Sequence, residues 1–208
     1  MTKFKCKLLS IGNNQKLGKN IGIFNLPQGI TCPGKTALCQ KICYACKAER
    51  CYKSARNMRL RNLMYINDYG TEKFTEDMIE EIKKSRVTMV RIHESGDFFF
   101  QGYLDAWVNI VKACSEVKFL SYTKSFMLNW QEAAKQPNWS ILWSIDNTTT
   151  LPVPFLGPTC YLRTPTDPIP LKGVTCQHTS SKHYCGTECH ICWNAHCHPA
   201  IKVYLDQH

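Results

Sequence analysis

The sequence predicts an α/β fold in which a mostly parallel sheet is followed by a cysteine-rich C-terminal metal-binding segment. Between residues 20 and 145, short apolar runs alternate with amphipathic stretches of helical periodicity, which is typical of βαβ units. After Pro152, prolines become frequent, helical periodicity fades and cysteines and histidines accumulate. We therefore expect an α/β core over 1–150 and a cysteine- and histidine-rich segment over 151–208 that packs on this core.

The first half of the chain predicts a buried strand over 20–26, closed by the turn residues that follow it. A cysteine loop comes next, over 32–51. Two helices are expected after it, over 47–66 and 75–84. Apolar residues in the second of these fall at positions i, i+1 and i+4, which is typical of a helix with one buried face.

Strands expected over 87–93, 118–123 and 140–145 alternate with helices expected over 101–114 and 130–135. In parallel sheets, functional sites lie beyond the carboxyl ends of the strands. The sequence places unusual polar residues at these ends. They are the first cysteine loop, His93 to Asp97, Thr123 to Ser125, and Asp146 with Asn147.

The segment from Cys176 to His198 holds five cysteines and five histidines but little apolar content. Such a segment cannot build a core of its own, so we expect a metal to organise it. Trp193 stands among these candidate ligands and is placed to shield a metal group from water. A last strand is expected over 201–205.

Composition and charge limit the classes of function. Apolar residues make up 44% of the 208 residues, and 26 Lys and Arg outnumber 16 Asp and Glu. This excess permits nucleic acid or another anionic partner, and it makes a basic ridge on the first expected helix a set of candidate phosphate contacts. No apolar run is long enough to span a membrane, and the start lacks a signal-peptide pattern, so we expect a cytoplasmic protein without a membrane partner. The candidate phosphate contacts are Arg50, Lys53, Arg56 and Arg59.

Thirteen cysteines, an odd number, favour metal binding over disulfides in a chain without a secretory signal. Most fall into two clusters whose inner members are both spaced C-x3-C-x2-C. Thiolates suit iron–sulfur groups and zinc alike, but structural zinc favours paired C-x2-C units. The first cluster thus favours [4Fe–4S], whereas the nearby histidines leave iron and zinc equally open for the second. The expected ligands are Cys32, Cys39, Cys43, Cys46, Cys176, Cys185, Cys189 and Cys192, with Cys51 and Cys197 as candidate extra ligands.

Five short motifs are spread over nearly the whole chain. They are Asn14 to Lys19, Cys32 to Thr36, Cys39 through Ala45, Arg91 to Phe98, and Cys189 through Trp193. Together they resemble the gene-product-88 domain family of phages and plasmids. This resemblance implies that a mobile element encodes the protein. If that element is a phage, the protein is located in the host cytoplasm. The resemblance implies no reaction.

A second, more distant resemblance rests on the order of features. An expected strand precedes the triplet Cys39, Cys43 and Cys46, and later strands end in the 94–97 turn and at Asp146. This order is similar to that of the radical S-adenosylmethionine (radical SAM) superfamily. The resemblance implies a partial (β/α) barrel, a [4Fe–4S] cluster with one iron open to S-adenosylmethionine, a 5′-deoxyadenosyl radical and an auxiliary C-terminal cluster. The residues it implies for cofactor binding are Glu94, Ser95, Gly96, Asp97 and Asp146.

Three functions stay open on the sequence alone. The first is a radical SAM-like enzyme, the second a non-catalytic iron–sulfur or zinc protein with a structural or nucleic-acid-binding role, and the third an electron-transfer protein with an external electron donor. The open iron discriminates between them, because a fourth thiolate from Cys32 or Cys51 would close it. Whether the chain is an enzyme, and on which substrate, does not follow from the residues.

Overall fold

A single eight-stranded sheet organises the chain. In the computed structural model the described residues are 7–12, 17, 20–150, 157–168, 172–176 and 184–206. The strands lie in the order β1-β2-β3-β4-β5-β6-β8-β7, and β1 alone pairs antiparallel among the described strands. The predicted α/β class with a mostly parallel sheet is therefore confirmed. The strands are β1 (Ser10–Ile11), β2 (Ile21–Phe24), β3 (Met89–Ile92), β4 (Lys118–Thr123), β5 (Trp139–Ile145), β6 (Thr159–Arg163), β7 (Val174–Thr175) and β8 (Lys202–Asp206).

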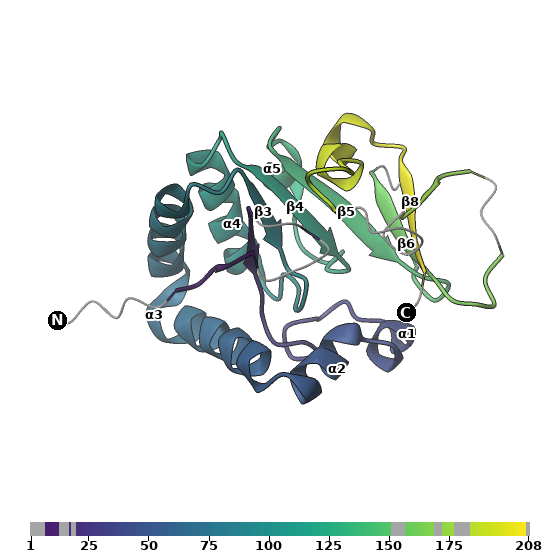
Figure 1. Cartoon of the computed structure of the whole chain (residues 1–208), viewed down its shortest axis with the longest axis horizontal. Coiled ribbons are helices and arrows are strands. Elements are labelled where there is room, and N and C mark those ends of the chain that lie inside the picture. Colours follow the sequence, from purple (N-terminus) through teal and green to yellow (C-terminus); the bar gives the residue numbers. More distant parts are fainter. Residues whose placement is uncertain are drawn as a thin grey trace.

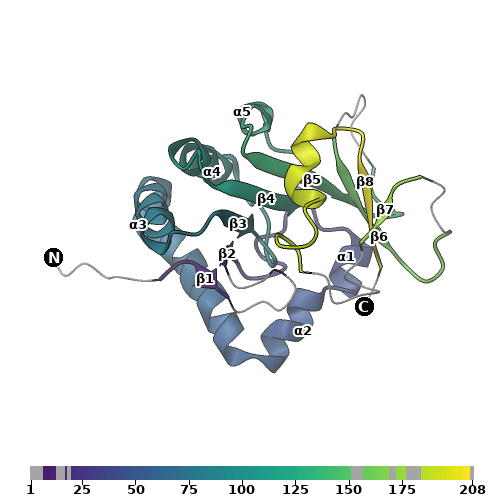
Figure 2. The ribbon, with the colours of Figure 1, turned by 45° about the horizontal axis from the view of Figure 1, so that its top comes forward.

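The sheet is open, because β1 ends it on one side and β7 on the other, and within the described ranges these strands do not pair to close a barrel. From β2 to β6, each strand lies beside the next one in the sequence. Right-handed crossovers in such an order place the connecting helices on one face of the sheet, as Figures 1 and 2 illustrate for α3 and α4. The helices are α1 (Ala37–Lys41), α2 (Tyr44–Cys51), α3 (Lys53–Ser85), α4 (Gln101–Ala113) and α5 (Gln131–Ala134), with a 3-10 helix η2 (Cys192–Cys197).

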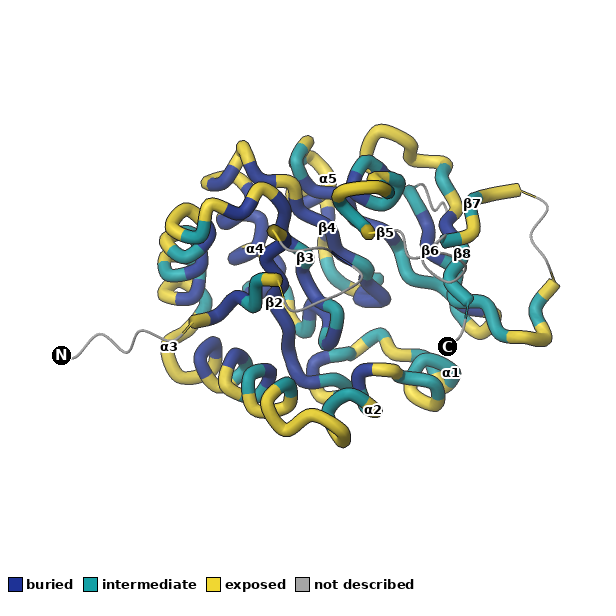
Figure 3. The backbone as a smooth tube through the Cα atoms, in the orientation of Figure 1, coloured by how far each residue is buried: buried dark blue, intermediate teal, exposed yellow. Residues whose placement is uncertain are grey.

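The two faces of the sheet carry separate cores. On the helix face, Phe24, Phe74 and Trp107 are fully buried and pack edge to face in one large cluster. On the opposite face, apolar strand residues such as Leu120 and Leu142 pack against Leu17 and the C-terminal segment. Figure 3 shows the interior strands buried between these two layers. The C-terminal segment therefore covers one face of the sheet and also adds β6, β7 and β8 to it.

The helices of the structure begin and end at other residues than the two helices expected over 47–66 and 75–84. The first divides at Tyr52, whose extended backbone (φ −123°, ψ 98°) separates α2 from α3. The second expected helix is the last part of α3, which Gly70 interrupts with a left-handed φ of 78°, a conformation that glycine adopts without strain. The two breaks turn the chain around the end of the sheet (Figure 1).

The other expected elements agree with the structure to within a few residues. The expected strand over 118–123 is β4, and the one over 201–205 is β8. The helix expected over 101–114 is α4. Among the described helices, none combines the length and apolarity needed to cross a membrane.

Candidate functional site

The first cysteine loop lies over the carboxyl ends of β3, β4 and β5. Thr36 caps α1, since its hydroxyl oxygen accepts a hydrogen bond of 3.0 Å from the backbone N–H of Cys39. Gly34 lets the loop approach the sheet, because a Cβ there would come within 1.9 Å of the carbonyl oxygen of Lys124. The loop is thus docked on the residue that follows β4.

Three thiols of this loop influence one another. Burial, with smaller contributions from Asp97, Cys39 and Cys43, raises the pKa of Cys32 to about 12. Burial also raises the pKa of Cys39, while Lys124 opposes the rise. Without a bound cation Cys32 and Cys39 stay protonated at neutral pH, because thiolates in such a place need a positive charge to compensate them.

The structure distributes the five loop cysteines unevenly. It brings Cys32, Cys39 and Cys43 together, whereas Cys46 and Cys51 follow along α2 and Cys51 is exposed. Cys32, an expected ligand, is therefore near Cys39 and Cys43 of the predicted triplet. Ligation by Cys46 stays a prediction.

The turn after β3 is held by the side chain of Asn25. Its carbonyl oxygen accepts hydrogen bonds from the backbone N–H groups of Glu94 (2.7 Å) and Ser95 (3.0 Å). Gly96 has a φ of 84°, and a Cβ at this position would lie 2.6 Å from the Cβ of Leu26. The turn is therefore a fixed feature of the strand end, with Glu94 half-buried and Ser95 buried.

Asp97 joins the ends of β3 and β4. Its carboxylate accepts hydrogen bonds from the Thr123 hydroxyl (2.7 Å), the Lys124 backbone N–H (2.8 Å) and the Phe98 backbone N–H (2.8 Å). Burial raises its pKa to about 6 despite these donors. Asp97 does not cap the next helix, since α4 begins at Gln101 with Phe100 as its N-cap.

Asp146 forms a buried ion pair with Lys124. The Lys124 Nζ lies 2.8 Å from Asp146 Oδ2, with 6% and 0% of the two side chains exposed, and it also donates to the Ser144 carbonyl oxygen at 3.1 Å. The Thr36 hydroxyl donates to the same carboxylate oxygen at 2.7 Å. The pair therefore ties β4, β5 and the cysteine loop into one unit, and the Asp146 carboxylate predicted to bind a cofactor is already occupied.

His93 is neutral and belongs to the helix-face core. Burial, with a smaller contribution from Arg91, lowers its pKa to about 3. Its Nε2 lies 2.8 Å from the Tyr103 hydroxyl. This arrangement favours a structural role for His93, which had been a candidate site residue at the strand end.

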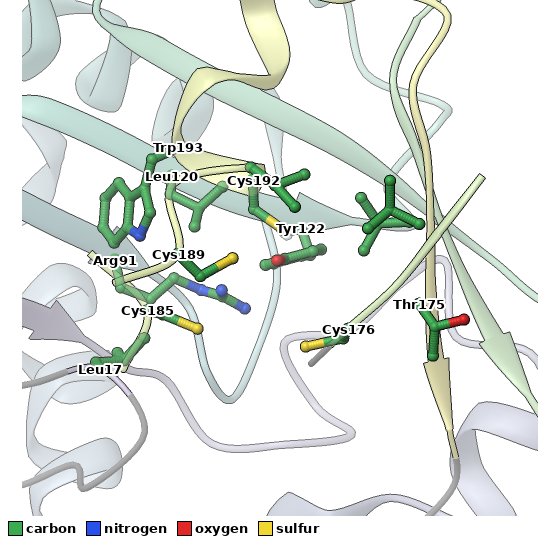
Figure 4. A pocket seen from close by; sticks show the side chains of 13 residues that line it. Leu17, Arg91, Leu120, Tyr122, Thr175, Cys176, Cys185, Cys189, Cys192 and Trp193 are labelled. Atoms are coloured by element: carbon green, nitrogen blue, oxygen red, sulfur yellow. The ribbon is translucent and has the colours of Figure 1, made fainter. Parts of the chain in front are cut away.

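Four cysteines of the second cluster line one cavity on the opposite face of the sheet. Figure 4 shows the sulfurs of Cys176, Cys185, Cys189 and Cys192 directed into the same space. Apolar residues, among them Trp193, complete the wall. All four were predicted ligands, and the expected place of Trp193 beside them is confirmed.

Local backbone features place these four thiols. Cys176 follows β7, and its N–H donates to the Tyr204 carbonyl oxygen at 2.8 Å. Gly186, with a φ of 94°, lets the segment approach Ile21 closely and donates its N–H to the Cys189 carbonyl oxygen at 2.8 Å. Cys192 begins η2.

Arg91 is the one cation among the described residues that line this cavity. Its guanidinium lies over the Tyr122 ring, 3.9 Å from the centroid, and its Nε donates to the His93 carbonyl oxygen at 3.3 Å. Burial raises the pKa of Cys192 to about 11, and the Tyr122 hydroxyl and Arg91 partly offset this rise. Arg91 therefore connects the cavity with the turn after β3, which was not foreseen because cysteine spacing does not mark a strand arginine.

Cys160 lies next to this cavity, although no role was predicted for it. It is fully buried on β6, and Cys192 and Cys176 add to the effect of burial in raising its pKa. The described histidines that left zinc open for the second site lie away from the cavity. His190, His196 and His198 are exposed and do not line the cavity, and Cys197 is also exposed; His178 and His183 lie outside the described residues.

The donor set of the cavity consists of thiols. Within the described part of the chain, no three His, Cys, Asp or Glu side chains converge closely enough to hold one ion. The four cavity thiols surround a space with apolar walls and one cation. Thiolate donors suit iron–sulfur clusters and zinc alike.

The basic ridge on α2 and α3 is only partly exposed. Arg50, Lys53 and Arg56 are exposed. Arg59 is 5% exposed, and its Nη1 donates to Glu49 Oε1 at 3.0 Å and to the Ala45 carbonyl oxygen at 3.2 Å. A phosphate cannot reach Arg59 without breaking this pair, so its prediction as a phosphate contact is corrected.

Comparison with known proteins identifies similar phage proteins. The family model described as Gene product 88 matches residues 5–158, more than half of the chain. The Gene 88 protein of Mycobacterium phage D29 is 34% identical over 140 residues, covering 61% of this chain and 58% of the relative. The Gene 88 protein of Mycobacterium phage L5 is 33% identical over 117 residues, covering 50% and 49%. The chain thus spans about half to three fifths of the length of these relatives, and no solved structure matches it.

Proposed function

The chain belongs to the gene product 88 family, whose name states no reaction, and from the residues themselves we propose an iron–sulfur protein with two cysteine sites. At least one site holds a [4Fe–4S] cluster. The observation that carries the proposal is the cavity lined by the four thiols of Cys176, Cys185, Cys189 and Cys192. Among the described histidines, none lines the cavity.

The setting of this cavity supports the same proposal. Apolar walls and a buried tryptophan exclude water, which protects a cluster from oxidation and hydrolysis. Arg91 supplies a positive charge beside the four thiols, which lowers the cost of burying thiolates there. A zinc site with four cysteine ligands satisfies this charge argument equally well, so metal analysis has to decide between them.

The first loop supports a second cluster with a different character. Cys32, Cys39 and Cys43 lie at the carboxyl ends of parallel strands, where sites form in such sheets. Three thiolates leave one iron of a cubane without a protein ligand. A radical SAM-like enzyme, in which S-adenosylmethionine takes that position within a partial (β/α) barrel, is the catalytic form of the proposal. If Cys46 supplies a fourth thiolate, that iron is closed and the non-catalytic form remains. The cluster then has a structural role, or it transfers electrons that an external donor supplies.

Anaerobic purification with iron, sulfide and zinc determination tests the proposal. Two cubanes give about eight irons per chain, and one gives about four. Cys189→Ser should remove the iron of the C-terminal site, whereas Cys197→Ser, which changes an exposed cysteine of the same segment, should leave it. A colourless protein that contains stoichiometric zinc and no sulfide would refute the iron–sulfur proposal.

The open iron has its own test. The dithionite-reduced protein is mixed with S-adenosylmethionine, and its electron paramagnetic resonance spectrum and the formation of 5′-deoxyadenosine are measured. The catalytic form predicts a changed spectrum that disappears in Cys39→Ser and persists in Cys51→Ser. An unchanged spectrum, together with loss of the first cluster in Cys46→Ser, would leave the non-catalytic form.

A further inference from the structure

We propose that α2 and the first turns of α3 form a surface that binds single-stranded nucleic acid. We call it the basic face and define it by Tyr44, Lys47, Arg50, Tyr52, Lys53 and Arg56, all of which are exposed. This inference does not depend on what the cysteines bind.

The charge of the chain is concentrated around the basic face. Residues 29–67 include eight Lys and Arg but a single acidic residue, Glu49. Glu49 is taken up by the buried Arg59, at 3.0 Å. The exposed cations of the segment therefore have no acidic neighbour within it, and together they create a positive potential that attracts a polyanion.

The backbone arranges these cations in a row of two successive pairs, one on α2 and one at the start of α3. Lys47 and Arg50 are three residues apart on α2, and Lys53 and Arg56 repeat this spacing at the start of α3, so each pair lies on one side of its helix. Tyr52 stands between the pairs, at the joint of the two helices. Figure 3 shows this part of the chain as an exposed edge of the molecule.

Two exposed aromatic rings give the row a second kind of contact. Tyr44 is 63% exposed and Tyr52 is 65% exposed. Tyr44 is also anchored, since its hydroxyl donates to the Glu94 carbonyl oxygen, so its ring is fixed beside Lys47. Cations that follow a phosphate backbone, combined with rings on which bases stack, are the features of single-strand binding.

This combination distinguishes between the forms of nucleic acid. A duplex covers the faces of its bases, so rings on a convex surface gain nothing from it. A single strand can present bases to Tyr44 and Tyr52 while its phosphates meet Arg50 and Lys53. The expected ligand is therefore single-stranded and bound without strong sequence preference.

The test uses a fluorescently labelled oligo-dT of about 20 nucleotides, a range that covers the site sizes of known single-strand binders. Binding by the full chain is measured over a series of salt concentrations, with a duplex of equal length and heparin as comparisons. Tyr52→Ala should weaken binding about fivefold or more at constant salt. Lys53→Ala/Arg56→Ala should lower the slope of log affinity against log salt by about 1.4, because each lost phosphate contact contributes about 0.7.

Lys83→Ala/Lys84→Ala is the matched control. It removes the same charge from exposed positions at the other end of α3, and it should change affinity less than twofold. Equal metal content and circular dichroism establish that all variants are folded. Two outcomes would show that the basic face is not a single-strand site. In the first, the control weakens binding as much as Lys53→Ala/Arg56→Ala does. In the second, Tyr52→Ala has no effect on affinity, and duplex or heparin binds as tightly as oligo-dT.

Discussion

The Lys124–Asp146 ion pair provides the most quantitative test of how the strand-end site is held together. Lys124→Met keeps the length of the side chain but removes its charge. Asp146 would then stay buried without the ammonium group that lies 2.8 Å from it in the native protein. Removing one member of a buried pair is costly, because it leaves an uncompensated charge away from water.

The expected loss is at the lower end of the range for such pairs. Breaking a buried pair costs about 3–5 kcal/mol. Asp146 keeps hydrogen bonds from the Thr36 hydroxyl (2.7 Å) and the Thr148 backbone N–H (2.9 Å), so we expect about 3 kcal/mol for Lys124→Met. In a chain of this size, this corresponds to a fall in Tm of roughly 6–12 °C.

The assay is thermal unfolding followed by circular dichroism, at equal metal content. Lys135→Met is the control, since Lys135 pairs with Glu132 at 67% and 57% exposure and should leave Tm unchanged. Lys124→Met/Asp146→Asn should lose less than the sum of the two single variants, because both then lack a charge. A loss below about 1 kcal/mol for Lys124→Met, or full additivity, would refute the buried-pair reasoning.

Three further predictions concern the same two sites. The pKa of Asp146 is lowered from its ordinary 3.8, because hydrogen bonds from Lys124, Thr148 and Thr36 outweigh the effect of burial. The stabilisation by the ionised carboxylate is therefore complete above about pH 4 and is lost as the pH falls below that value. Below about pH 4, the free energy of unfolding of Asp146→Asn should depend less on pH than that of the native protein. Gly34→Ala should displace the cysteine loop, because the new methyl group would meet the Lys124 carbonyl oxygen, and it should lower the iron content of the first site alone; unchanged iron would contradict the docking described for this loop. Arg91→Gln should make the reduction potential of the C-terminal cluster more negative by several tens of millivolts, and a potential equal to that of the native protein would exclude Arg91 as its counter-charge.

Local pattern was sufficient to predict the parallel part of the fold. The strands β2 to β5 and the helices between them have regular periodicity and clear turn signals, so tertiary contacts agree with local preference. The outer part was harder, because β6 is a five-residue strand in a proline-rich region and β7 has only two residues. Such strands form because the sheet offers a partner, and no local signal marks them.

The candidate site was predicted in position but only partly in membership. Cysteine spacing identified the four thiols that line the cavity, because ligands of one site are often close in sequence. It could not identify Arg91, which lines the cavity, or Cys160, which lies next to it, because strand register alone places them there. In the first loop, Cys32 was a predicted ligand, and the turn at Pro33 and Gly34 brings it toward Cys39 and Cys43 across a longer gap than the C-x3-C-x2-C pattern contains.

The two cysteine sites have different surroundings, which leads us to assign them different roles. The C-terminal cavity is enclosed by Trp193 and apolar strand residues, so the cluster proposed there would stabilise the segment that covers this face of the sheet. The first loop lies instead among polar groups at the strand ends, where Lys124 lowers the pKa of Cys39 against the effect of burial. Reactive chemistry needs access for a second molecule, and the open ends of parallel strands provide it whereas a packed face does not. If this protein is an enzyme, its reaction therefore belongs to the first loop. The Nε of Arg91 donates to the carbonyl oxygen of His93, so the second site is in direct contact with the end of β3, from which the 94–97 turn begins.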